Sequence, residues 1–271
     1  MYGFFPAPRV ALLALMGAFC IAPVVAQTGP GGVGDSTATF GSDKLTVWLR
    51  ADAGVTVVEG AEAKNDSKEV DLWEDVSGQG HDFEDNAYNG NKEILRQPQY
   101  VPNALNGRPI LRFNTANESK KDVLTSSDTD VLDVVEGDNT FFLVSAARES
   151  LTGSNNFWHL YRFTNPNQTE SMGYPGKSAG KISVDKGGDP VLDLPSPITD
   201  YHIFSSVSDN TTDTQEDLAV DGTVRKTAGS STTTASGRIE IGNNGTLAKE
   251  NFAEFIIFKK DLNTAQRRLV A

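Results

Sequence analysis

Short apolar runs, separated by polar and glycine-rich stretches, follow one another along most of the chain. Many of them are rich in aromatic and β-branched residues, and several alternate strictly between apolar and polar positions. A period of two residues is typical of strands that bury one face. The strands that this pattern predicts fall within residues 44–49, 108–113, 140–147, 156–163, 181–184, 201–207, 217–222, 238–242 and 252–258.

Two local signals refine this strand pattern. Asp221 and Gly222 stand between two strand-like segments, where an Asp-Gly pair is a strong signal for a hairpin turn. Only the C-terminal end is helix-like: Asn263 can cap a helix, and Gln266 follows three positions later, as in a capping box. Many short strands without alternating helices predict an all-β fold, a two-sheet antiparallel β-sandwich of the jelly-roll kind with a short C-terminal helix.

The N-terminal part differs from the rest of the chain. Residues 10–22 form an apolar run of 13 residues, and Val24 and Ala26 stand at the −3 and −1 positions of a cleavage site. Such a run is too short to span a bilayer as a helix and is typical of a secretory signal peptide. We therefore expect a signal peptide, a flexible leader rich in Gly, Ser and Thr, and one β-sandwich domain, at residues 1–26, 27–43 and 44–271.

Charge and cysteine content narrow the function classes. The chain has 24 basic and 36 acidic residues, which gives a formal net charge of −12. Such a surface repels nucleic acid and anionic lipid, so we expect no nucleic-acid partner, and no later segment is long enough to span a membrane. Cys20, the only cysteine, lies inside the predicted signal peptide, so the mature chain has no disulfide and no cysteine nucleophile.

Several stretches occur in an order that resembles a known family. They are LTVWLRADAGV (45–55), LWEDVSGQGHDF (72–83), QPQYVPNALNGRPILRF (97–113), LAVDG (218–222) and FAEFIIFKKDLNTAQRRLV (252–270). Together they resemble the laminin-G-like, concanavalin A-like jelly-roll domains of many secreted bacterial proteins. The resemblance implies a fold that hosts lectins, glucanases and adhesion domains, so it leaves the function open.

An acidic triplet lies within one of these stretches. Glu69, Asp71 and Glu74 spell E-x-D-x-x-E. Laminarinase-type glucanases, which share the fold, carry such a signature, with the first Glu as nucleophile and the last as acid and base. On a regular strand Glu69 and Asp71 share one face while Glu74 points to the other, so only a bulge would bring the three carboxylates together.

The residues from Trp73 onward support a structural interpretation instead. We expect Trp73 to pack in the core, Asp75 to accept backbone N–H bonds in a turn, and Gly78 and Gly80 to supply positive φ angles. Trp48, in the segment that resembles the family's opening strand, is also assigned a structural role. We favour this interpretation because it accounts for more residues and because the motif follows so soon after the first predicted strand.

An aromatic strand offers a candidate binding surface. Strict alternation along residues 156–163 would place Trp158 and Arg162 on one face. A flat indole ring buries a large area with little loss of entropy, which suits stacking against a sugar. The alternative for this strand is packing of both faces between the two sheets.

An acidic stretch at residues 208–217 offers a candidate calcium site. Calcium takes six to eight oxygen ligands. The oxygens that this stretch could supply belong to Asp209, Asn210, Asp213 and Asp217. Their spacing does not match an EF-hand loop, and a solvated hairpin loop is the alternative.

These observations lead to three hypotheses about function. The first is a secreted, non-catalytic module, periplasmic or extracellular, that binds a polysaccharide or a cell-surface glycan. The second is a glycoside hydrolase of the laminarinase type that uses Glu69, Asp71 and Glu74. The third is a structural or adhesion spacer of a larger exported protein.

Overall fold

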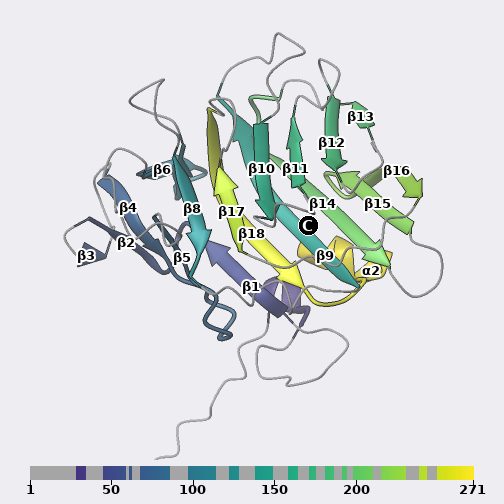
Figure 1. The fold of residues 1–271 in the computed structure, drawn as a ribbon, viewed down its shortest axis with the longest axis horizontal. Coiled ribbons are helices and arrows are strands. Elements are labelled where there is room, and N and C mark those ends of the chain that lie inside the picture. The colour runs from purple at the N-terminus through teal and green to yellow at the C-terminus, as the bar shows by residue number, and fades with distance from the viewer. Residues whose placement is uncertain are drawn as a thin grey trace, which may run out of the picture.

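In the part of the chain that it describes, the computed structural model has an all-β fold with a single short α-helix near the C-terminal end (Figure 1). The parts that it describes are residues 29–34, 45–58, 61–62, 68–85, 97–113, 122–127, 138–148, 158–163, 171–174, 181–185, 191–193, 198–209, 215–229, 238–242 and 249–271. Within them the strands form two antiparallel sheets that pack face to face. The predicted two-sheet β-sandwich with a C-terminal helix is thereby confirmed.

One sheet, here called the helix-side sheet, has the strand order β16-β15-β14-β9-β18. Strands β1 and β7 both pair with the free side of β18, and β6 pairs with β7. The bounds are β1 Leu45–Arg50, β6 Gln99–Leu105, β7 Arg108–Arg112, β9 Asn139–Ala147, β14 His202–Asp209, β15 Gln215–Val220, β16 Thr223–Gly229 and β18 Glu250–Phe258.

The opposite sheet has the strand order β3-β2-β4-β5-β8-β17-β10-β11-β12-β13. The bounds are β2 Val55–Val57, β3 Ala61–Glu62, β4 Lys68–Trp73, β5 Phe83–Asp85, β8 Val123–Ser126, β10 Trp158–Phe163, β11 Ser171–Tyr174, β12 Lys181–Asp185, β13 Val191–Asp193 and β17 Ile239–Gly242. The strand predicted from each apolar run is present in one of the two sheets.

Both local signals in the sequence are confirmed. Asp221 and Gly222 connect β15 to β16 with φ angles of 51° and 70°, the positive values that a tight hairpin turn needs. Helix α2 (Thr264–Val270) begins with a capping box, in which the Asn263 side chain accepts from the Gln266 backbone N–H at 3.0 Å. The Gln266 side chain in turn accepts from the Asn263 backbone N–H at 3.1 Å.

Aromatic side chains fill the space between the two sheets. Phe113 and Phe252 meet edge to face, with ring centroids 4.9 Å apart, and Trp73 is fully buried. The largest buried side chains of this inter-sheet core are Trp73, Phe83, Phe113, Phe141, Phe204, Phe252 and Phe255. Without any described disulfide, this packing is the main source of stability.

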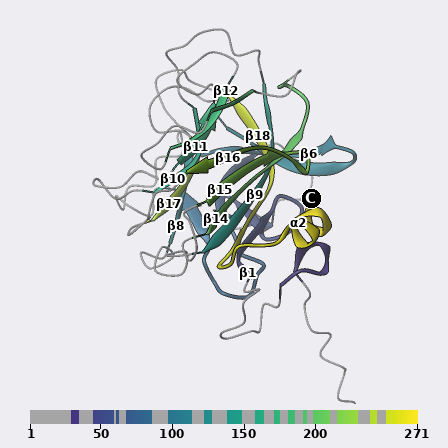
Figure 2. The ribbon, with the colours of Figure 1, turned by 90° about the vertical axis from the view of Figure 1, so that its right-hand side faces the viewer.

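A second, smaller apolar cluster lies on the outer face of the helix-side sheet, away from the opposite sheet. Figure 2 shows α2 on this side of β9 and β14, and β8, β10 and β11 on the other side. A short 3₁₀ turn, η1 (Pro30–Gly32), packs beside α2. The cluster beneath them contains Val33, Leu45, Phe142, Ile256, Phe258 and Leu262. We call this part of the outer face the covered half.

The N-terminal segment departs from the expected flexible leader at 27–43. Within this segment, residues 29–34 pack against the domain, and Val33 is only 5% exposed. Gly31 has a φ of 61°, and a Cβ atom built there would lie 1.9 Å from the Leu269 carbonyl oxygen. Only a glycine permits this close approach to α2. Within the described residues, no helix is long and apolar enough to cross a membrane.

Candidate functional site

The outer face of the helix-side sheet changes character along its strands. On β18, Ile256 belongs to the covered half, whereas Glu254 faces outward beyond the edge of α2 and η1. On β9, Phe142 is buried in the covered half, whereas Val144 is only partly buried. We call the outer face around Glu254, Val144 and Arg50 the open half.

The open half contains a cleft with a volume of about 120 Å³. One wall is the β6–β7 hairpin, whose turn residues Asn106 and Gly107 have positive φ angles of 49° and 80°. Figure 2 shows this hairpin projecting on the same side of the sheet as α2. The residues that line the cleft are Arg50, Asp52, Leu105, Arg108, Pro109, Val144, Ala253 and Glu254.

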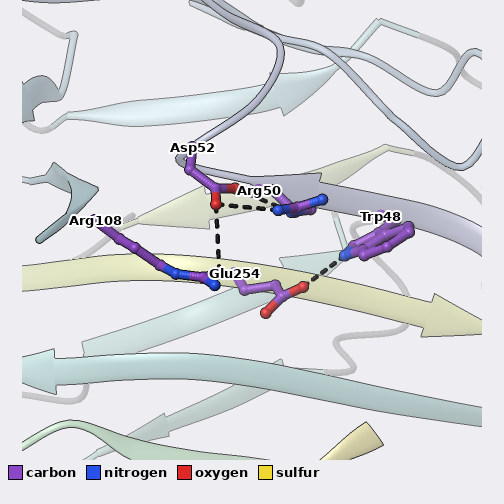
Figure 3. A network of polar contacts seen from close by, with 5 residues as sticks. All are labelled: Trp48, Arg50, Asp52, Arg108 and Glu254. Carbon is purple, nitrogen blue, oxygen red and sulfur yellow. Dashed lines mark hydrogen bonds and ion pairs between the residues drawn. The ribbon is translucent and has the colours of Figure 1, made fainter. Parts of the chain in front are cut away.

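Trp48 lies at the border between the two halves. Its ring packs partly against the covered cluster, and its indole Nε1–H donates to Glu254 Oε1 at 2.5 Å (Figure 3). The guanidinium carbon of Arg50 lies 5.2 Å from the centre of the Trp48 ring, a cation–π distance. The side chains meet because β1 pairs with β18, which places Arg50 opposite Glu254.

Asp52 joins β1 to the β6–β7 hairpin. Arg50 Nη2 donates to Asp52 Oδ2 at 3.0 Å, Arg50 Nε forms an ion pair with Oδ1 at 3.0 Å, and Arg108 Nη1 lies 3.4 Å from Oδ2 (Figure 3). The Arg108 side chain comes from β7 and is 71% exposed. A guanidinium carries five N–H donors, so a single long contact to Asp52 leaves Arg108 able to donate to a ligand.

Burial raises the pKa of Glu254 above its ordinary value. The hydrogen bond from Trp48 and the positive charges of Arg50 and Arg108 oppose this rise, and the charge of Asp52 adds to it. The indole N–H of Trp48 holds the Glu254 side chain at the floor of the cleft, where its carboxyl oxygens can accept from a ligand.

The cleft thus presents hydrogen-bond donors and acceptors beside an aromatic ring. Arg50 and Arg108 supply donors, while Asp52 and Glu254 supply acceptors. Among the described residues, no group of three or more His, Cys, Asp or Glu side chains could hold a metal ion. The combination of arginine donors and carboxylate acceptors suits a ligand rich in hydroxyl groups, because each hydroxyl group both donates and accepts.

The sequence analysis did not select this site. Arg50 and Asp52 lie in the stretch that resembles the family, and Arg108 and Glu254 lie in predicted strands. The available signal was a pair of outward polar positions, Arg50 and Glu254, on strands that are otherwise apolar. Arg50 and Glu254 come together only because β1 pairs with β18, a strand that is distant in the sequence.

Asp75 lies in the turn that follows β4. Its carboxylate accepts from the backbone N–H groups of Trp48, Ser77 and His81, at 2.8, 2.9 and 3.1 Å. The Ser77 hydroxyl donates to it at 2.7 Å, and Gly78 and Gly80 have φ angles of 85° and 81°. These contacts connect the turn to β1, so Asp75 helps to hold the strand that carries Trp48 and Arg50.

Glu69 and Asp71 lie on β4 and Glu74 follows it directly, and the strand is not regular but contains the bulge that the sequence analysis named as the exception. Thr56 pairs with Leu72 and Val57 pairs with Val70, which leaves Asp71 as an extra residue in a bulge. Because of the bulge, Val70 and Trp73 both face the core, although they are three positions apart. Glu69 and Glu74, each next to one of these residues, therefore lie on the same side of the strand and not on opposite sides.

Strand β4 also passes from one sheet to the other. Glu69 pairs with Gln99 of the helix-side sheet, whereas Trp73 pairs with Phe83 of the opposite sheet. Glu74 is exposed, and its Cβ lies beside Gly54 at the start of β2. The triplet therefore follows a strand that joins the two sheets and is not displayed on one continuous sheet face.

The aromatic strand at 156–163 does not alternate strictly. In β10, His159 pairs with Gly173 and Tyr161 pairs with Met172, so Leu160 is an extra residue on β10. This bulge removes the basis for placing Trp158 and Arg162 on one face. Their side chains lie outside the described part of the structure, so their use in binding stays a prediction.

The candidate calcium ligands are described only in part. Asp209 ends β14 and Asp217 lies in β15, and the two strands pair with each other. The side chains of these two residues, and all of Asn210 and Asp213, lie outside the described residues. Calcium binding at 208–217 therefore stays a prediction.

Known proteins resemble this chain in structure rather than in sequence. No family model matches the chain, and no curated protein matches it. A sialidase of Trypanosoma rangeli in complex with sialic acid has a TM-score of 0.55 at 14% identity, and the match covers 92% of this chain and 35% of the sialidase.

Botulinum neurotoxins give similar matches. One is the type C toxin, whose cell entry depends on interaction with two ganglioside molecules, with a TM-score of 0.59 at 10% identity. Another is the binding domain of botulinum neurotoxin DC in complex with SialylT, with a TM-score of 0.55 at 10% identity. Each match covers 84% of this chain and 51% of the toxin chain. At such low identity the likeness shows a shared β-sandwich fold alone, and the chain spans about half or less of these proteins.

Proposed function

We propose that the chain is a secreted, non-catalytic carbohydrate-binding module of the laminin-G-like, concanavalin A-like kind, and that the cleft of the open half is its binding site. The observation that carries the proposal is the set of donors and acceptors that line this cleft, two of which, Arg50 and Glu254, also contact the neighbouring Trp48. The fold supports it, because the similar structures include a sialidase in complex with sialic acid and a neurotoxin whose cell entry depends on interaction with two ganglioside molecules.

The side chains of the cleft are held in place before any ligand binds. Asp52 holds Arg50 through two contacts of 3.0 Å and restrains the exposed Arg108 through one longer contact, and the indole N–H of Trp48 holds Glu254. A prearranged site loses less conformational entropy on binding than a site of mobile side chains. A lower entropy loss matters for a sugar, because its many hydroxyl groups must give up hydrogen bonds to water when it binds.

The proposal includes export of the chain. The apolar run at 10–22 and the Val24-x-Ala26 site support cleavage before Gln27. Cleavage there would keep Gly29–Gly34, the segment that packs beside α2, in the mature protein. N-terminal mass spectrometry of secreted protein is expected to give Gln27 as the first residue, and an intact Met1 would contradict it.

A glycan array tests the binding proposal. We expect the wild type to bind a subset of printed glycans and Arg108→Ala to bind them at least about tenfold more weakly. Because Arg108 is largely exposed, its loss should leave the melting temperature unchanged. Arg268→Ala, which removes an exposed arginine of α2, is the matched control and should bind like the wild type.

Two outcomes would contradict this proposal in different ways. Binding to no printed glycan, by a folded wild type, would reject the carbohydrate-binding function and favour a structural spacer. Equal binding by wild type and Arg108→Ala would place the site elsewhere, for instance on β10.

The bulge in β4 favours a second candidate, a retaining glycoside hydrolase. The bulge puts Glu69 and Glu74 on one side of the strand, as the laminarinase-type signature requires. The passage of β4 between the two sheets weighs against it, because a shared substrate cleft needs one continuous face.

Hydrolysis assays decide between the two candidates. We expect no cleavage of β-1,3- or mixed-linkage glucans by the wild type, and similar melting temperatures for wild type and Glu69→Gln. Cleavage that disappears in Glu69→Gln, in a variant that still folds, would establish the hydrolase instead.

A further inference from the structure

A second polar cluster lies on the open half, beside the cleft. Arg112 Nε of β7 donates to Asn251 Oδ1 of β18 at 3.1 Å. The side chain of Asn251 also hydrogen-bonds to the hydroxyl of Tyr201, which directly precedes β14. All three residues are half-buried. They do not line the cleft described above.

Strand register places this cluster next to the cleft. Asn251 lies opposite Arg112 on one side and Ala146 on the other. Glu254 lies opposite Arg50 and Val144 in the same way. Because Val144 and Ala146 are two positions apart on β9, the two clusters are separated by roughly 7 Å along the strands.

A bulge in β18 makes this alignment possible. The register shifts between Phe252 and Glu254, so Asn251 and Glu254 both face outward although they are three positions apart. Phe252 keeps its place in the inter-sheet core. On the neighbouring β9 the position beside Glu254 is Val144, which is partly exposed, and the position beside Asn251 is Ala146, which is buried, so no bulky β9 side chain projects between the two clusters.

The second cluster has the chemistry of a sugar subsite. Burial raises the pKa of Tyr201, with the nearby Arg112 and the hydrogen bond from Asn251 acting against the rise. The hydroxyl of Tyr201 therefore stays protonated at neutral pH and keeps both its donor and its acceptor functions. Its ring adds an apolar face beside these polar groups.

We propose that the open half binds an extended oligosaccharide across two adjacent subsites, with one sugar unit in the cleft and the next unit on Arg112, Asn251 and Tyr201. The proposal rests on the proposed carbohydrate-binding function and specifies, in addition, that the ligand is long enough to span two subsites. Once the first unit is bound, the second reaches its subsite at a high effective concentration. An oligosaccharide should therefore bind much more tightly than its terminal monosaccharide.

Immobilised mono-, di-, tri- and tetrasaccharides of glucose, galactose, N-acetylglucosamine and N-acetylneuraminic acid test this proposal. For each series that binds, the wild type should prefer the disaccharide to the monosaccharide by at least about tenfold. Asn251→Ala and Tyr201→Phe should reduce that preference to less than about threefold while leaving monosaccharide binding unchanged. Arg268→Ala is the matched surface control, and melting curves confirm that each variant folds.

The result separates failure of this inference from failure of the proposed function. Equal binding of mono- and oligosaccharides, or an unchanged preference in both folded variants, overturns the two-subsite proposal and leaves carbohydrate binding in place. No binding to any member of the four series by the folded wild type overturns the inference, and the wider array described above then decides the proposed function.

Discussion

The two halves of the outer face of the helix-side sheet use the same strands for different purposes. In the covered half, β9 and β18 contribute Phe142, Ile256 and Phe258, which are buried beneath α2 and η1. In the open half, the same two strands contribute Val144 and Glu254, which are only partly buried. A shift of two positions along one strand therefore separates packing from a candidate binding site.

The difference between the two halves follows the position of α2 and the N-terminal segment on the outer face of the sheet. Where α2 and the N-terminal segment lie on the sheet, both of its faces are buried and the strands are apolar at nearly every position. Where the cover ends, polar residues such as Arg50 of β1 and Glu254 of β18 take outward positions, whereas β9 keeps the apolar Val144 and Ala146 there. Trp48 lies at this border, because its ring packs against the covered cluster and its N–H group reaches Glu254.

The largest expected effect is a loss of stability from the covered half. Phe258 is fully buried, so Phe258→Ala should lower the free energy of unfolding by about 3–5 kcal/mol. Val144→Ala, at a partly buried position of the open half, should cost roughly 1 kcal/mol. Urea titrations measure both values. Equal losses for the two variants would mean that the outer cover contributes little to stability.

A smaller effect is expected where the N-terminal segment meets α2. Gly31 and Gly32 both have positive φ angles, but only a Cβ at Gly31 would strike the Leu269 carbonyl. Both substitutions to alanine carry a backbone cost of about 1–2 kcal/mol. Gly31→Ala should cost at least about 1 kcal/mol more than Gly32→Ala, because the segment must move off α2. Similar melting temperatures for the two variants would show that this contact does not stabilise the covered half.

The smallest effect concerns the charge of Glu254. Because its pKa is raised in the folded protein, its ionisation opposes folding, and this loss of stability grows as pH rises from the ordinary value of 4.5 through the folded pKa. Glu254→Gln removes the charge and keeps an acceptor for Trp48. The variant should match the wild type below pH 4.5 and exceed its stability near pH 7. Thermal melts across this range measure the difference, and a variant less stable than the wild type near pH 7 would contradict the raised pKa.

Much of the fold could be predicted from local patterns. Alternating apolar runs located many of the strands, and Asp221-Gly222 and Asn263 located a hairpin and the helix start. Strands without such a run, among them β2 and β8, were missed because three or four residues carry too little periodicity.

The candidate site was harder to predict, since it depends on pairing between distant segments. The cleft needs Arg50 beside Glu254, 204 positions later in the chain, and no local pattern encodes that pairing. A bulge also changed the geometry of the acidic triplet. One extra residue at Asp71 altered the faces that strict alternation assigns to Glu69 and Glu74.

The central claim is that a glycan binds on the open half, and the indole N–H signals of the tryptophans test it most directly. In protein labelled with ¹⁵N at tryptophan, Trp48 reports on the cleft, whereas the buried Trp73 is an internal control. Titration with 3′-sialyllactose, laminaritetraose and any glycan bound on the array should shift the Trp48 indole signal and leave Trp73 in place. A binding glycan that shifts only the Trp158 signal, or none of the three, would contradict the claim.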